Sequence, residues 1–274
     1  MLKVWIEENK LEKSDYPNKM EFYEFQEKIE ITTEIKKDIA KRVLLGLKSQ
    51  EYLKFRFNSL SSEEIQKYLI NSILPNKNIP FSPQKSMWGE IISAEILNVF
   101  REHLIPIYKL RYKEKKDQAM RGHADVVTYL DKNPLIIAFT EVKTKGNVKK
   151  KSSAYYEEEM EKAENGLLKN NVDNPEILEY ICERLFDEKD FSLLQKFDYA
   201  FKNPKTYKKE FHIFMIIEKN RWSEEIIDFF KEKSTELPNL TLNIVLINSL
   251  NELIDETYEI ILDTAEDVIN DFKE

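Results

Sequence analysis

The stretch from Gly122 to Lys143, GHADVVTYLDKNPLIIAFTEVK, contains two apolar runs separated by a short polar segment. The runs His123–Leu130 and Leu135–Lys143 are predicted to be β-strands, because each is short, apolar and bounded by turn residues. The second run stays almost entirely apolar until its end, which is typical of a strand buried on both faces. Between them, Asp131-Lys-Asn-Pro134 favours a tight turn. We therefore expect a β-hairpin.

Charged residues stand at the open end of this hairpin. Asp125 lies near the start of the first strand, and Glu141 and Lys143 lie at the end of the second. Alternate residues of a strand point to the same face, so Glu141 and Lys143 share one. Asp125 and Glu141 are each about eight residues from the centre of the turn, so they can lie opposite each other. Two carboxylates and one ammonium are thus expected at one edge of the sheet.

This group of charges predicts a site for a divalent cation. Two neighbouring carboxylates raise each other's pKa, and a bound cation relieves that repulsion. Ligation by oxygen suits Mg²⁺ or Mn²⁺. Lys143 can orient or help to deprotonate a water molecule, or stabilise the charge that grows on a phosphate. We predict that Asp125 and Glu141 are metal ligands and that Lys143 is catalytic.

A helix from about Ser86 to His103 offers a third carboxylate. Glu95 falls within its apolar stripe, which consists of Trp88, Ile91, Ile92, Ile96 and Val99. A glutamate is rarely buried unless it is paired or bound to a metal, so Glu95 is favoured as a further ligand. Glu90 lies off the stripe near the helix start, where the helix dipole accounts for a carboxylate. The choice between the two glutamates stays open.

The rest of the chain predicts an α/β fold, a mixed central sheet flanked by helices. Residues 1–84 are expected to form an N-terminal accessory, α-rich region, and residues 85–274 the main domain. Further strands are expected at Ile105–Arg111, Phe211–Glu218 and Thr241–Asn248. Further helices are expected at about 33–54, 61–73, 152–168, 174–186, 189–200, 223–236 and 263–274, from apolar spacing, capping residues and composition.

These residues resemble the PD-(D/E)xK nuclease superfamily, whose restriction-endonuclease-like core has the order α-β-β-β-α-β. The family carries an Asp on the second strand, Glu-x-Lys on the third and often a helical Glu before them. The matching residues here are Asp125, Glu141, Lys143 and either Glu95 or Glu90, within about residues 86–218. Ala124 stands where the family often has Pro. The resemblance implies a Mg²⁺-dependent deoxyribonuclease that leaves a 5′-phosphate and a 3′-hydroxyl.

A narrower resemblance is to HamA, the nuclease-like subunit of the Hachiman anti-phage defence system. It is carried by the chain length, the N-terminal region, the Gly89-Glu90-x4-Glu95 helix and the Gly122-x-x-Asp125 strand. HamA works beside a helicase, HamB. The resemblance implies DNA degradation that is held in check until the helicase partner meets abnormal DNA.

Positive charge is concentrated near the predicted site. Residues 109–151 hold 12 Lys and Arg against 5 Asp and Glu, a local net charge of +7 that leaves −15 for the rest of a chain whose total is −8. A basic segment of this kind is typical of a surface that contacts phosphates. A lysine-rich loop exposed to solvent would explain the same charge. The predicted DNA contacts are Lys145, Lys149, Lys150 and Lys151. The alternative to a nuclease is a non-catalytic protein-interaction module on the same fold, which the acidic remainder of the chain would suit. In that alternative, Glu141 and Lys143 form a structural ion pair.

Several classes of site are disfavoured. Cys182 is the single cysteine, so an intrachain disulfide and a cysteine-based zinc site are excluded. His103, His123 and His212 are scattered, and a His-rich metal site is not expected. Gly is scarce and no phosphate-binding loop is found, so no nucleotide cofactor is predicted. No apolar run approaches 18 residues and no secretory signal opens the chain, so a cytoplasmic protein without a membrane span is expected.

Overall fold

The computed structural model describes residues 1–11, 20–77, 83–118, 124–146, 153–170, 176–222 and 235–270. Its strands are β1 Ile6–Leu11, β2 Glu21–Glu27, β3 Val126–Leu130, β4 Ile136–Lys145, β5 Lys208–Glu218 and β6 Leu240–Ile247. Its α-helices are α1 Leu2–Trp5, α2 Thr33–Leu47, α3 Gln50–Phe57, α4 Ser62–Tyr68, α5 Pro83–Arg101, α6 Ser153–Asn170, α7 Glu176–Asp187, α8 Phe191–Lys202 and α10 Leu250–Asn270. A π-helical turn spans Leu69–Ile73, and 3₁₀ turns span Lys109–Tyr112, Pro204–Thr206 and Lys219–Arg221.

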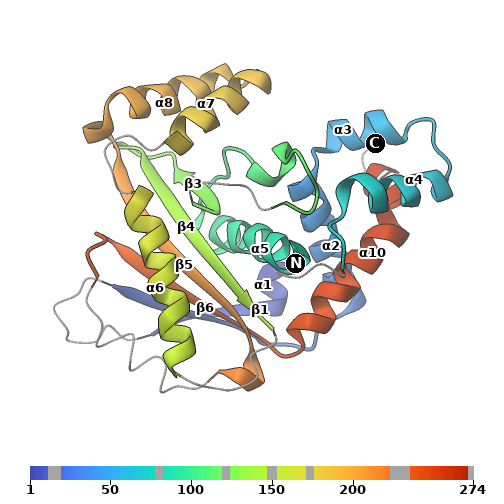
Figure 1. Ribbon diagram of the computed structural model, residues 1–274, viewed down its shortest axis with the longest axis horizontal. Coiled ribbons are helices and arrows are strands. Elements are labelled where there is room, and N and C mark those ends of the chain that lie inside the picture. The colour runs from blue at the N-terminus through green and yellow to red at the C-terminus, as the bar shows by residue number, and fades with distance from the viewer. Residues whose placement is uncertain are drawn as a thin grey trace.

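Among the described residues, six strands form one mixed sheet in the order β1-β2-β6-β5-β4-β3 (Figure 1). The four inner strands run parallel, while β1 pairs antiparallel with β2 and β3 pairs antiparallel with β4. Helices cover both faces, so the predicted α/β class is confirmed. Strand β6 is wholly buried and β5 is buried from Phe211 to Ile217, as parallel strands between two helical layers require.

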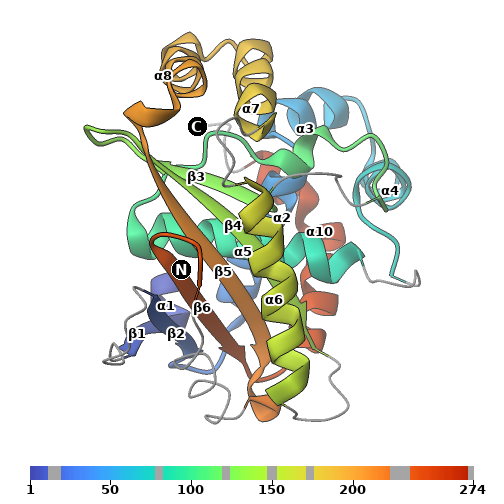
Figure 2. The same ribbon diagram turned by 60° about the vertical axis from the view of Figure 1, so that its left-hand side comes forward.

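Each face of the sheet has its own hydrophobic core. On one face, α2, α5 and α10 pack over Phe214, Ile216 and Val245. On the other face, α6 lies along the sheet, and α7 and α8 pack at one end, over Phe211 and Ile213 (Figure 2). The alternation of Phe211, Ile213 with Phe214, Ile216 follows the period of two along β5. The site described below lies where the edge of the sheet meets both helical layers.

The predicted hairpin is present as β3 and β4. The register pairs Val126 with Thr140 and Leu130 with Ile136, with the Asp131–Pro134 turn between the strands. β4 continues to Lys145, well beyond the last residue that pairs with β3, and there β5 is its pairing neighbour on the other side. The end of β4 is therefore an open edge of the sheet.

The predicted strand at Ile105–Arg111 is wrong. This part of the chain makes an isolated bridge between Leu104 and Tyr129, and then forms the 3₁₀ turn Lys109–Tyr112. Hydrogen bonds to the end of α2 take the place of strand pairing. The side chain of Arg111 donates to the carbonyl of Leu45, and the carbonyl of Arg111 accepts from the side chain of Lys48. The Arg111 carbonyl is thus satisfied without a strand partner, and the Arg111 side chain satisfies a carbonyl near the end of α2.

The N-terminal region contributes more than helices. Residues of the predicted α-rich region also form the strands β1 and β2, and β2 pairs with β6 along six residues. The helices of this region share one core with α5 and α10. The boundary near residue 84 stays a prediction, and the predicted helix at 223–236 lies mostly outside the described residues. Within the described ranges, the helices are too short or too polar to cross a membrane.

Candidate active site at the edge of the sheet

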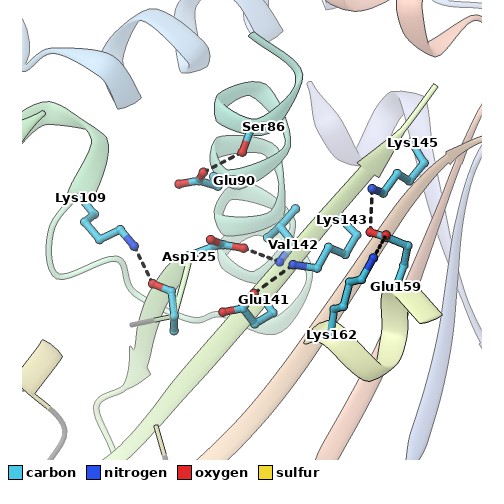
Figure 3. Close-up of polar contacts among 11 residues, drawn as sticks. Ser86, Glu90, Lys109, Asp125, Glu141, Val142, Lys143, Lys145, Glu159 and Lys162 are labelled. Atoms are coloured by element: carbon cyan, nitrogen blue, oxygen red, sulfur yellow. Dashed lines mark hydrogen bonds and ion pairs between the residues drawn. The ribbon is translucent and has the colours of Figure 1, made fainter. Parts of the chain in front are cut away.

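The strand register brings Asp125 beside Glu141. Val126 pairs with Thr140, so the residue before Val126 faces the residue after Thr140. One Asp125 oxygen accepts the backbone N–H of Val142 at 2.8 Å. This bond caps a β4 donor beyond the last residue that β3 pairs, and it holds the Asp125 carboxylate at the open edge (Figure 3). The predicted opposition of Asp125 and Glu141 is confirmed.

Glu141 and Lys143 lie on the face of β4 that is covered by α6. Lys143 Nζ lies 3.2 Å from a Glu141 oxygen, and the Glu141 residue is only 9% exposed. Gly166 of α6 leaves the space for this carboxylate, since a Cβ atom there would lie 3.0 Å from Glu141 Oε1. Glycine in mid-helix is unfavourable by itself, so its presence here serves a close approach.

The helical carboxylate that faces Asp125 is Glu90. Its side chain accepts a hydrogen bond from Ser86 at 3.2 Å, and it points toward Asp125 (Figure 3). The preceding residue, Gly89, lets α5 pack close to β4, because a Cβ atom there would lie 2.0 Å from Thr144 Oγ1. Asp125 thus lies between Glu90 on one side of the sheet edge and Glu141 on the other.

Lysines surround the three carboxylates. Lys109 donates to the backbone carbonyl of Ala124 at 2.7 Å, directly before Asp125. Lys109 also lines a small cavity beside Glu90 and Asp125. Lys113 is near enough to Glu90 to act on its ionisation. Both lysines belong to the basic segment found in the sequence, but their contact with the carboxylates follows only from the fold.

The carboxyl groups are strongly perturbed. Burial, followed by the negative charge of Asp125, raises the pKa of Glu90 to about 8 and that of Glu141 to about 7. The positive charges of Lys109, Lys113 and Lys143 oppose these shifts and do not cancel them. Burial also lowers the pKa of Lys113 to about 8. Near neutral pH the carboxyl groups of both glutamates are therefore partly protonated, and a divalent cation would displace these protons.

A family model named HamA matches residues 1–261, nearly the whole chain. This chain belongs to the HamA family. HamA proteins are part of the Hachiman defence system, so this HamA chain is a Hachiman defence-associated protein. A search of curated proteins finds no match.

The HamA chain does not bring Glu95 to the site. One oxygen of Glu95 accepts from the guanidinium of Arg42, and the other accepts from the hydroxyl of Tyr108. Both partners come from outside α5 and account for the burial of this carboxylate. Glu95, the favoured ligand, is thus held in a structural ion pair away from Asp125, and Glu90 is the α5 carboxylate that faces Asp125. Metal binding by these carboxylates stays a prediction.

The predicted DNA-contacting lysines of the HamA chain have separate outcomes. Lys145 ends β4 and lies 2.6 Å from Glu159 of α6, so an ion pair already engages it. Lys149, Lys150 and Lys151 lie outside the described residues. Their role stays a prediction.

Two histidines of the HamA chain do not stand alone, contrary to expectation. His103 follows α5, His212 lies on β5, and their rings are 5.6 Å apart between centroids. With Glu210 they form a group whose candidate ligand atoms all lie within 4.8 Å of one another. Burial, followed by the neighbouring His212, lowers the pKa of His103 to about 4. Sequence reasoning missed this cluster because the two histidines are 109 positions apart in the chain.

Proposed function

We propose that this HamA family member is a metal-dependent nuclease that hydrolyses DNA phosphodiester bonds as the effector of its defence system. The observation that carries the proposal is the convergence of Glu90, Asp125 and Glu141 beside Lys143 at an open sheet edge. Here two of the carboxyls stay perturbed despite the lysines around them, which is typical of functional sites.

The donor set suits Mg²⁺ or Mn²⁺. Asp125, Glu141 and Glu90 offer hard carboxylate oxygens, the ligands that these cations prefer. When bound, the cation would neutralise charge on the phosphate that is attacked. One Asp125 oxygen is used by the N–H of Val142, which leaves its other oxygen for the cation.

Protein groups would perform the rest of the reaction. Lys143, held by its ion pair with Glu141, would orient the attacking water. The oxygen of that water bonds to phosphorus, the bond from phosphorus to the 3′-oxygen breaks, and the leaving oxygen takes up a proton. The products are a 5′-phosphate and a 3′-hydroxyl, as the superfamily resemblance implies. Lys109 and Lys113 supply positive charge for the nucleic-acid backbone.

A helicase partner is proposed on the family resemblance. The chain outside residues 109–151 carries a net charge of −15, which disfavours a second DNA-binding surface and suits a protein partner. Nuclease action would then depend on the state of the partner.

The decisive experiment measures cleavage of plasmid DNA by the full chain with Mg²⁺, alone and with a candidate helicase partner. Glu141→Gln and Lys143→Met are expected to lower cleavage by about 100-fold or more. Glu252→Gln, at an exposed position of α10, is the matched control and retains activity. Titration with Mn²⁺ distinguishes a nuclease that needs a partner for activity, which still binds the metal, from a protein without a metal site. A wild-type chain that neither binds Mn²⁺ nor cuts DNA refutes the proposal.

One observation favours the alternative, a non-catalytic interaction module. Lys143 and Glu141 are within ion-pair distance, as that alternative requires. It predicts that Glu141→Gln changes partner binding or stability while no condition gives metal-dependent cleavage. The same assays therefore distinguish the two functions.

A further inference from the structure

A second group of potential ligands lies on the face of the sheet that α5 covers. Glu210 and His212 are two residues apart on β5 and share a face with Phe214 and Ile216 of that core. His103 reaches them from the loop after α5. Its backbone N–H donates to Leu97, and its carbonyl accepts from Asn98, so the loop holds the ring in place.

Both imidazoles aim the same nitrogen at one carboxylate oxygen. Nε2 of His103 lies 3.8 Å from Glu210 Oε2, and Nε2 of His212 lies 3.9 Å from the same atom. These separations exceed hydrogen-bond length. They are close to the ~3.4 Å that separates ligand atoms around tetrahedral zinc, given metal–ligand bonds of about 2.1 Å.

Polar partners hold the other ring nitrogens. His103 Nδ1 lies 2.9 Å from the buried hydroxyl of Thr128, and His212 Nδ1 lies 3.4 Å from the side-chain amide of Asn243. Partners of this kind orient the imidazoles of metal sites and leave Nε2 for the metal. The fully buried Thr128 and the 1%-exposed Asn243 are well placed for that role.

The cluster also contains buried polar atoms without partners among the described residues. His212 is 6% exposed, and its Nε2 has no hydrogen bond. The hydroxyl of Thr140, the residue that pairs with His212 in the sheet, is buried and equally unsatisfied. Such atoms cost free energy unless a ligand or water meets them. The Glu210 side chain is 31% exposed, which gives the cluster an opening.

We propose that His103, Glu210 and His212 bind one Zn²⁺ ion, with water completing the coordination. Two imidazoles and one carboxylate bind Zn²⁺ in preference to Mg²⁺. The site therefore differs in chemistry from the carboxylate group at the sheet edge. The ion would join the end of α5 to the centre of the sheet. It stabilises the helix that carries Glu90 and does not depend on the proposed nuclease function.

The test uses the full chain, stripped with a chelator and then titrated with Zn²⁺, with Co²⁺ absorption as a report on ligand geometry. The wild type is expected to bind one equivalent that survives the double substitution Glu90→Gln/Glu141→Gln. His212→Gln and the milder Glu210→Gln are each expected to weaken this binding at least 10-fold. His123→Gln is the matched control for loss of a histidine and is expected to change nothing.

Unfolding temperature is measured for every variant without metal, so that a misfolded protein is not mistaken for a lost site. Added Zn²⁺ is expected to raise it in the wild type and not in Glu210→Gln. The proposal is overturned if the wild type binds no Zn²⁺, or if binding persists in folded His212→Gln and Glu210→Gln. Loss of binding only in Glu90→Gln/Glu141→Gln would assign the ion to the sheet edge and overturn it as well.

Discussion

Glu90 and Glu95 lie on the same helix, and their surroundings give them different chemistry. Glu95 has a guanidinium and a phenol at its two oxygens. Glu90 has the Ser86 hydroxyl and faces another carboxylate, Asp125. A carboxylate with fixed partners adds stability, whereas one that is buried against a like charge costs free energy and is free to bind a cation.

Substitution of the two glutamates is expected to separate stability from activity. Glu95→Gln is expected to lower the free energy of unfolding by about 1–3 kcal/mol, because Arg42 and Tyr108 lose a charged acceptor, although Arg42 keeps its ion pair with Asp38. Glu90→Gln is expected to lower Mg²⁺-dependent DNA cleavage by about 100-fold or more without lowering stability, because it removes a carboxyl whose ionisation the fold opposes. Urea unfolding and a cleavage assay per folded molecule measure the two effects. Equal loss of activity in both variants would contradict the assignment.

The perturbed glutamates also predict a pH dependence of stability without metal. The pKa values of Glu141 and Glu90 are raised to about 7 and about 8, so the folded chain binds more protons than the unfolded chain above the ordinary glutamate range. Their contribution to stability is therefore largest at low pH and is lost as the pH rises to about 8.

Urea unfolding at pH 5.5 and pH 8.5 tests this sign. Relative to Glu90→Gln/Glu141→Gln, the wild type is expected to lose stability between these values, and saturating Mg²⁺ is expected to restore more of it at the higher pH. Identical pH profiles for the two proteins would show that the glutamates titrate normally.

At the scale of elements, two helices approach β4 through glycine. Gly89 brings α5 against Thr144, and Gly166 brings α6 against the Glu141 carboxylate. Each helix forms from its own apolar spacing, but its distance from the sheet depends on the missing side chain. The position of the carboxylates is therefore a property of helix–sheet packing.

Gly166→Ala is expected to favour the helix and harm the site. Alanine raises helix stability by up to about 1 kcal/mol, while its Cβ would displace a carboxylate now 3.0 Å away. Cleavage is expected to fall by about 10-fold or more, because small displacements at a reacting centre are costly. Asn165→Ala, at an exposed position of α6, is the control and should keep full activity. Unchanged cleavage in Gly166→Ala would show that the packing of α6 on the sheet accommodates the added methyl group without displacing the Glu141 carboxylate.

At the scale of the whole molecule, the N-terminal residues are part of the sheet. β2 covers one side of β6, and Phe25 of β2 stacks on Phe214 of β5. Helix α2 packs against α10 from the other end of the chain. Removal of this region would expose a long, apolar edge strand and half of one core.

A fragment of residues 85–274 is therefore expected to lack a cooperative unfolding transition. Far-UV circular dichroism during heating measures this, and co-expression of residues 1–84 is expected to restore the transition. A sharp transition in the isolated fragment would instead support an independent domain that begins near residue 85.

The sequence by itself determined the hairpin, its register and the meeting of Asp125 with Glu141. These features are local: the period of two along each strand and the turn near Pro134 decide which residues face each other. It also determined most helices and the central strands, whose apolar runs are long. Strand β1 at the edge of the sheet and strand β2 inside it escaped detection because charged residues interrupt the apolar pattern of both.

Only the tertiary structure decided which glutamate of α5 joins the site. A helical wheel places Glu95 in a buried stripe. It cannot show that Arg42 and Tyr108 contact Glu95, because both of these residues lie outside the helix. The same holds for His103 and His212, which β5 and the loop after α5 bring together. Contacts between distant residues depend on how whole elements pack, and no local spacing encodes them.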